Sequence, residues 1–338
     1  MKDLMRRWAT WETFLAILTL AVVGYAAYAL PAFTSAFNIS QAIAGASERA
    51  LIAMPMAILI IAREIDLSVA SILSLSSVVF GVAVQSAVPL PAAMAMALAT
   101  GALCGAFNGL LVTRAGLPSL VVTLGTLAMF RGVGYILLGP KSVNQFPDAF
   151  TDFGIDTIGS SVLPWTIAPF LVIAPLFFLV LQKSVIGRRI YAIGGSPGTA
   201  LYSGIRVARI RFLLFVVSGL VSGLAAIVFT ARVANARADN ALGLELDVIT
   251  VALLGGVSVF GGKGKLTGVF WALLLVATVR NVLGLQRIGG DAQGTIIGLL
   301  LIGTLLVSAT TQRLLARASR PQAKLEGRAS GGPLMPTG

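Results

Sequence analysis

The sequence predicts an all-α polytopic membrane protein, and three observations lead to this fold class. First, only 11% of the 338 residues are charged and 57% are hydrophobic, whereas a soluble domain carries about 25% charged residues. Second, the apolar stretches are as long as membrane-spanning helices. Third, these stretches lack the alternation over about ten residues that is typical of a membrane β-barrel.

About ten stretches are long and apolar enough to be spans, since a helix needs about 20 residues to cross about 30 Å of hydrocarbon. Glu48 and Arg49 interrupt the second stretch, and the eighth is short. The predicted spans are 13–30, 42–62, 68–86, 92–113, 119–138, 165–182, 210–230, 247–260, 264–284 and 292–310.

Basic residues are distributed unequally between the two sides of these spans. With the N-terminus in the cytoplasm, 18 of the 25 Lys and Arg residues fall in inner segments, as the positive-inside rule requires. We therefore expect both termini to be cytoplasmic. The same loops account for the net charge of +12, so no nucleic-acid partner is predicted. The seven basic residues left outside or within spans are Arg49, Arg131, Lys141, Arg232, Arg237, Arg280 and Arg287.

This topology divides the chain into three parts. Residues 1–12 form a cytoplasmic N-terminus, residues 13–312 a transmembrane domain, and residues 313–338 a flexible cytoplasmic tail rich in Gly, Pro and Ala. The transmembrane domain contains two long loops. Residues 139–164 are expected outside and residues 183–209 inside.

A weak internal repeat relates the third and eighth spans. The stretch "IDLSVASILSLSSVVFGV" at 65–82 resembles "LDVITVALLGGVSVFGGK" at 246–263, which aligns Asp66 with Asp247 and Ser77 with Ser258. The two segments enter the membrane from opposite sides, as an inverted five-plus-five repeat requires; chance similarity is the equal alternative. An acidic residue beside a Ser/Gly-rich helix also favours a discontinuous helix near the midplane.

Several classes of chemistry are excluded by composition. The chain has no histidine, and its single cysteine lies in an apolar run, so His- or Cys-based metal sites and Ser-His catalysis are not expected. The stretch "GGVSVFGGKGK" at 255–265 lacks the spacing and the hydroxyl of a phosphate-binding loop. We therefore expect no metal and no cofactor, and no ATP bound by this chain through such a loop.

Three acidic residues lie at predicted helix ends and are assigned structural roles there: Asp66, Glu245 and Asp247. A catalytic pair of membrane aspartates, sharing a proton, is the alternative for Asp66 and Asp247.

Polar residues within the predicted spans are candidates for a solute path, because such groups are costly in lipid. Bonding between helices is the equal alternative for each. Neutral hydroxyl and amide groups suit a polyhydroxylated solute better than an ion. The candidates are Asn108, Thr123, Thr126, Arg131 and Asn281.

The segment "GRRIYAIGGSPGTALYSGI" at 187–205 is basic and predicts a short helix on the cytoplasmic face. Ser196 can cap a helix that starts at Pro197, and Gly204 can end it. Such a helix suits docking to another protein; an ordinary interfacial loop helix is the alternative. The candidate docking residues are Ser196, Pro197, Gly198, Thr199, Ala200, Leu201, Tyr202, Ser203 and Gly204.

Four long motifs resemble the permease subunits of bacterial monosaccharide ABC importers, the ribose/xylose/arabinose-type branched family. They are "REIDLSVASILSLSS", "FNGLLVTRAGLPSLVVTLGTLAMFRGVGYILLG", "GRRIYAIGGSPGTALYSGI" and "ELDVITVALLGGVSVFGGKGKLTGVFWALL". The resemblance runs from about residue 40 to 310. It implies a pair of permeases (two copies or two paralogues), cytoplasmic ATP-binding subunits, a periplasmic solute-binding protein and a bacterial inner membrane with its lipids. It also implies that residues 196–204 are the helix that couples the permease to its ATPase.

The sequence departs from the family pattern at Arg63, Glu64 and Ala70, where the family commonly has glycine, and at Ser196 and Pro197. These changes affect the expected substrate rather than the class. The stretches "VPLPAAMAMALATGALCG", "FPDAFTDF" and "SPGTALYSGI" are most similar to autoinducer-2 and rhamnose importer permeases within the family.

The sequence thus predicts a permease subunit of a binding-protein-dependent ABC importer for a small sugar or sugar-like solute, and not an enzyme. A self-sufficient secondary transporter and an intramembrane enzyme are the alternatives.

Overall fold

The structure is a computed structural model that describes residues 11–290, 292–300, 302–303 and 306. Over Trp11–Leu285 it consists of helices joined by short connections, with only two isolated β-bridges, Val143 with Ala236 and Thr157 with Pro164. The helices are α2 (Trp11–Ala29), η1 (Pro31–Thr34), α3 (Ala36–Ile61), α4 (Val69–Gln85), α5 (Leu90–Thr113), α6 (Ser119–Leu138), α7 (Asp148–Ile155), η2 (Trp165–Ile167), α8 (Ala168–Lys183), α9 (Val185–Gly195), α10 (Pro197–Tyr202), α11 (Val207–Val233), α12 (Leu244–Leu254) and α13 (Leu266–Leu285).

The all-α polytopic fold class is confirmed, because seven segments of the described part are helical, long and apolar enough to cross a membrane. They contain α2, α3, α5, α6, α8, α11 and α13. The predicted third span is the shorter apolar helix α4. The tenth predicted span, 292–310, lies partly outside the described residues. Most of the N-terminal segment 1–12 and all of the tail 313–338 also lie outside them.

The eighth predicted span is too long. Residues 247–260 were expected to be one helix, but α12 ends at Leu254. Gly256 has a φ of 85° and donates from its N–H to the Leu253 carbonyl, while Val257 donates to Ala252. This pair of hydrogen bonds is the glycine-dependent helix stop known as the Schellman motif. With 11 residues the helix is about 16 Å long and cannot span a membrane alone.

The two segments of the proposed repeat are not built alike. Asp66 precedes α4 and lies outside it, whereas Asp247 is within the first turn of α12. Ser77 is inside α4, but Ser258 lies beyond the end of α12.

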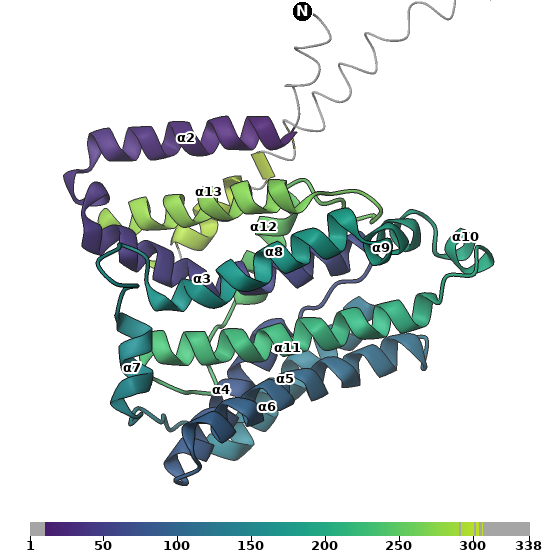
Figure 1. The fold of residues 1–338 in the computed structure, drawn as a ribbon, viewed down its shortest axis with the longest axis horizontal. Coiled ribbons are helices and arrows are strands. Elements are labelled where there is room, and N and C mark those ends of the chain that lie inside the picture. Colours follow the sequence, from purple (N-terminus) through teal and green to yellow (C-terminus); the bar gives the residue numbers. More distant parts are fainter. Residues whose placement is uncertain (1–10, 291, 301, 304–305, 307–338) are drawn as a thin grey trace, which may run out of the picture. The chain divides into compact units, whose positions relative to one another are not determined.

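The long helices lie roughly along one common axis, with α10 at one end of the bundle and α7 at the other (Figure 1). We call these the α10 end and the α7 end. Helix α11 lies between α3 on one side and α4 and α5 on the other, and α2 packs against α13. The external loop predicted at 139–164 contains the helix α7, which packs on α11.

Helices α5 and α11 approach each other through glycine, which we call the α5–α11 glycine contact: Gly101, Gly105, Gly219 and Gly223. A Cβ added at Gly105 would meet the Phe215 carbonyl, and one at Gly219 would lie 2.8 Å from the Gly105 Cα atom. Each helix carries its two glycines four residues apart, the small-xxx-small spacing that lets membrane helices pack backbone to backbone.

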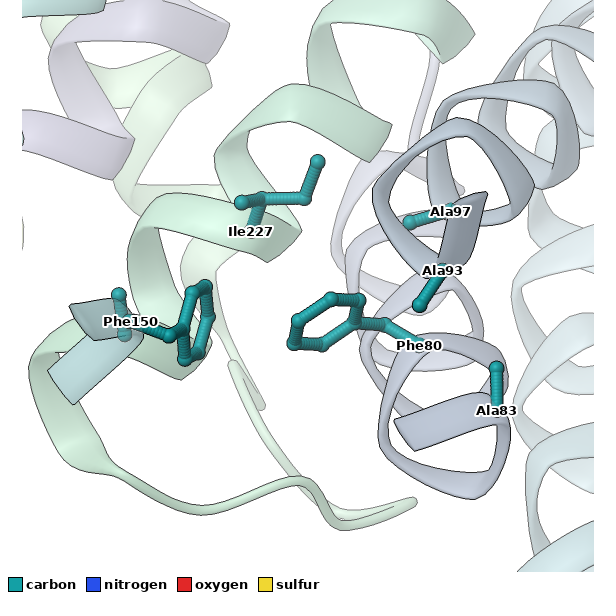
Figure 2. Close-up of a cluster of buried hydrophobic side chains, with 7 residues drawn as sticks. Phe80, Ala83, Ala93, Ala97, Phe150 and Ile227 are labelled. Carbon is teal, nitrogen blue, oxygen red and sulfur yellow. The ribbon is translucent and has the colours of Figure 1, made fainter. Parts of the chain in front are cut away.

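A cluster of buried apolar side chains fixes α7 against the bundle. Phe80 of α4 and Phe150 of α7 have ring centroids 4.8 Å apart, and Ile227 of α11 lies beside them (Figure 2). Ala93 and Ala97 of α5 leave room for the two rings (Figure 2). The cluster therefore holds the α7 end of four helices together.

Candidate functional site

Residues 184–205, which we call the α9–α10 segment, contain two capped helices. The Ser184 hydroxyl accepts a hydrogen bond from the Gly187 N–H at 3.1 Å and caps α9, and the Ser196 hydroxyl accepts one from the Thr199 N–H at 3.3 Å and caps α10. Gly204, with a φ of 78°, ends the second helix as the sequence predicts. The sequence analysis missed α9, although the spacing of its buried Ile190 and Ile193 is helical.

Helix α10 presents two large side chains outward. Leu201 is 62% exposed and Tyr202 is 93% exposed, whereas Ala200 on the opposite side is buried. A helix of six residues is not stable by itself. Its capping and its attachment to α9 therefore hold these two side chains in place.

The α9–α10 segment is attached to the end of α3 and to the glycine turn, residues 255–265. Gly262 donates from its N–H to the Ile61 carbonyl at 2.8 Å, and a Cβ at Gly194 would collide with that same carbonyl oxygen. The Tyr191 hydroxyl donates to the Gly264 carbonyl at 2.6 Å. Burial raises the pKa of the Tyr191 phenol, so it remains a neutral donor.

Arg63 adds a second connection between the same three parts. Its Nε donates to the Phe260 carbonyl at 2.6 Å and its Nη2 to the Gly195 carbonyl at 3.1 Å. The Arg63 backbone has a φ of 65°, a left-handed conformation that glycine adopts readily and that residues with a side chain rarely adopt. The arginine at this departure from the family pattern therefore joins α3, α9 and the glycine turn.

A buried hydrogen-bond network surrounds Asp66, between α3 and α4. Its Oδ1 accepts from the Ser68 N–H at 3.0 Å and from the Ser68 hydroxyl at 2.6 Å, and its Oδ2 accepts from Ser218 of α11 at 3.3 Å. Asn108 of α5 donates to the Ser68 hydroxyl at 2.7 Å. We call these four residues the aspartate cluster, and it joins the start of α4 to α5 and α11.

A second polar group, the charged cluster, joins α3, α11, α12 and α13. The distances are 2.7 Å for Arg232 to Glu48, 3.8 Å for Arg49 to Glu48, 3.2 Å for Arg49 to Asp247 and 2.6 Å for Arg280 to Asp247. The Glu48 side chain is only 1% exposed. Three arginines and two carboxylates leave one net positive charge. The sequence analysis placed these arginines outside or within spans but did not identify their partners.

The five path candidates are not brought together. Asn108 is in the aspartate cluster, and Thr123 and Thr126 are buried on α6, where Thr123 donates to the Ile65 carbonyl at 3.2 Å. Arg131 donates to the carbonyls of Ala238 and Asn240 in the loop before α12. The contacts of Thr123 and Arg131 tie α6 to the connections before α4 and before α12, and the assignment of these residues to a solute path stays a prediction.

Asn281, the fifth path candidate, pairs with Asn38 through two amide hydrogen bonds of 3.0 and 2.9 Å. Both line a largely apolar cavity of about 360 Å³ between α3, α8 and α13.

The acidic candidates have separate surroundings. Asp66 bonds to serines and Asp247 to arginines, and no hydrogen bond links the two, so their geometry is not that of a proton-sharing pair. Glu245 is in the first turn of α12. Within the described ranges, no group of three His, Cys, Asp or Glu side chains is placed to hold a metal ion.

An all-α bundle of long apolar helices, with polar groups bonded between its segments, is a multi-pass membrane protein. Residues 38–305 match the family model described as "Branched-chain amino acid transport system / permease component". The chain belongs to this family, and it is a multi-pass inner-membrane transport permease. The resemblance read from the four motifs is confirmed.

Similar curated proteins cover most of the chain. It is 34% identical over 315 residues to the autoinducer 2 import system permease protein LsrC of Enterobacter sp. (strain 638), which covers 91% of this chain and 89% of that protein. It is 36% identical over 259 residues to LsrD of Escherichia coli (strain K12) and of Shigella flexneri, with 75% of this chain and 78% of each relative covered. No solved structure matches the chain.

Proposed function

We propose that the chain is the transmembrane permease subunit of a binding-protein-dependent ABC importer for a small sugar or sugar-like solute of the autoinducer 2 or rhamnose kind. The relatives named above are permeases of autoinducer 2 import systems, which supports the solute class. In this proposal a partner subunit binds ATP, a periplasmic protein delivers the solute, and a second permease, identical or paralogous, completes the pore.

The observation that carries the proposal is the α9–α10 segment. It is held by α3 and the glycine turn, yet exposes Leu201 and Tyr202. Exposed large side chains on a preorganised helix are the usual anchors of a protein interface. Here the partner is the ATPase, and its closure displaces α10.

The connections of this segment give the displacement a route. Because Gly262 and Gly194 both contact the Ile61 backbone, a movement of α9 reaches the end of α3. The free energy of ATPase binding at α10 can then shift the equilibrium between two conformational states of the helix bundle.

The orientation follows from the same proposal. The α10 end faces the cytoplasm with both termini, and the α7 end faces the periplasm. Reporter fusions at residue 338 and within 139–164 should therefore report opposite sides. Reporters on the same side would contradict this orientation.

The test is Leu201→Ala with Tyr202→Ala. Truncating a hot-spot side chain costs about 2 kcal/mol or more, and about 1.4 kcal/mol is tenfold in affinity. Co-purification of the ATPase should fall at least about tenfold and uptake should stop. The matched control is Leu242→Ala, an exposed residue in the loop before α12, which should leave co-purification unchanged. Normal co-purification together with normal uptake in the double variant would show that α10 is an ordinary interfacial loop helix. Uptake without any ATPase would favour the secondary transporter.

A further inference from the structure

A small pocket lies where α5 ends and α11 begins, at the α10 end of the bundle. Its volume is about 240 Å³, and it is lined by Leu110, Thr113, Arg114, Ala208, Arg209 and Phe212. We call it the basic pocket. Helices α5 and α11 run side by side to this end (Figure 1), so the pocket opens between two membrane-spanning helices.

Both arginines of the basic pocket are exposed, and within the described ranges no carboxylate forms a salt bridge with either. Arg211, two residues further along α11, is different, because it pairs with Glu64 at 2.8 Å. Two unpaired guanidinium groups beside one cavity repel each other and favour an anion between them. The guanidinium fork matches phosphate oxygens in pairs.

The apolar surface next to the basic pocket extends along α5. Met96, Leu103, Phe107 and Leu110 are all exposed, Leu103 by 70%, and their spacing places them with Arg114 on one helix face. From Met96 to Arg114 this face is about 27 Å long at 1.5 Å per residue, close to the thickness of the hydrocarbon core. A soluble protein bound at the membrane surface cannot cover it.

We propose that the basic pocket binds the phosphate headgroup of an anionic phospholipid, whose acyl chain lies along Leu103, Phe107 and Leu110 of α5. The phosphate of such a lipid would pair with Arg114 and Arg209, and its hydrocarbon chain would cover the exposed apolar face of α5. Basic pockets between transmembrane helices are suited to such headgroups. The proposal needs only membrane insertion and does not depend on the transported solute.

The test compares anionic phosphatidylglycerol with zwitterionic phosphatidylcholine on the purified full-length permease, by native mass spectrometry of bound lipid. Each surface cation contributes about 1 kcal/mol to attraction of anionic lipid. Arg114→Gln with Arg209→Gln should therefore lower the preference for phosphatidylglycerol about thirtyfold, since about 1.4 kcal/mol is tenfold. Arg114→Lys with Arg209→Lys keeps the charge and should keep most of the preference, which excludes misfolding as the cause.

The matched control is Arg188→Gln with Arg189→Gln, which removes two charges from α9 and leaves the basic pocket intact. It should lower the preference less than Arg114→Gln with Arg209→Gln does, because neither residue lines the basic pocket and the attraction of a cation falls off within a Debye length. An equal preference in the wild type and in the Gln variant of Arg114 and Arg209 overturns the proposal. So does inorganic phosphate that displaces phosphatidylglycerol and binds as tightly, because the site then recognises a free anion. Loss of ATPase co-purification with unchanged lipid preference assigns the two arginines to the ATPase instead.

Discussion

Replacing Gly219 with alanine should destabilise the permease by forcing α5 and α11 apart. The new Cβ would lie 2.8 Å from both the Cα and the N atom of Gly105 and would collide with the Gly101 carbonyl. Ordinary contacts between carbon atoms are about 3.5–4.0 Å long, and a gap of about 0.5–1 Å forfeits a quarter to a half of each contact's attraction. Overpacking of this kind costs about 1–3 kcal/mol. The upper part of that range applies, because all the atoms met are backbone.

The matched control is Gly24→Ala in α2, where a Cβ meets no atom within 4 Å. Both substitutions gain up to about 1 kcal/mol of helix propensity, so the gain cancels when they are compared. We expect Gly219→Ala to be about 2–3 kcal/mol less stable than Gly24→Ala. Unfolding of the purified proteins in detergent with added sodium dodecyl sulfate, followed by circular dichroism, measures the difference. Equal stability of the two variants would refute the close approach of α5 and α11.

Two further predictions concern buried polar groups. Glu48→Gln leaves Arg232 without its charged partner and should lower the unfolding free energy by about 2–3 kcal/mol, which is less than the usual cost of a broken buried pair because the arginine is partly exposed. The control is Asp239→Asn, which breaks an exposed pair and should leave the unfolding free energy unchanged. Equal effects of the two substitutions would contradict the role of burial. Tyr191→Phe removes one hydrogen bond to the glycine turn and should cost about 1 kcal/mol. Burial raises the pKa of this phenol above the ordinary value of about 10. The cost should therefore be constant from about pH 6 to pH 9 and decline only as pH rises through the folded pKa, because the phenolate cannot donate to the Gly264 carbonyl. A cost that already falls near neutral pH would show that the phenol ionises there and would contradict the raised pKa.

The fold class and the capping of α10 were predictable because both depend on local sequence. Apolar length identifies a span, and a serine, a proline and a glycine in the right order identify a short capped helix. The end of α12 was also encoded locally, in Gly255 and Gly256, but the apolar residues beyond them concealed it.

The partners of the polar residues were not predictable from one sequence. Hydropathy places Glu48 within the second predicted span and Arg232 just beyond the seventh. It does not say that these two residues, 184 positions apart in the chain, form an ion pair. Arg63 was recognised only as a departure from the family pattern. Its side chain bonds to two carbonyls from a backbone with a positive φ, a conformation that is not expected for arginine. Asn108 was selected as a path residue because it is polar, and the structure shows that its amide is used between helices.

Helix α3 connects the two groups of contacts that matter most for the proposed coupling. Its last residue, Ile61, is held by Gly262, and Glu48 and Arg49 are held by α11 and α12. These two points are 13 residues apart, which is about 20 Å of helix.

Between them lies Pro55. A proline inside a helix removes one backbone hydrogen bond and weakens the helix against bending at that turn. The charged cluster is costly to separate, because its carboxylates would be left buried without partners. A displacement of α9 should therefore bend α3 at Pro55 and leave the contacts of Glu48 intact. In the proposed coupling, the part of α3 that moves with α9 is therefore the part that leads directly into Asp66 of the aspartate cluster, where α4 begins.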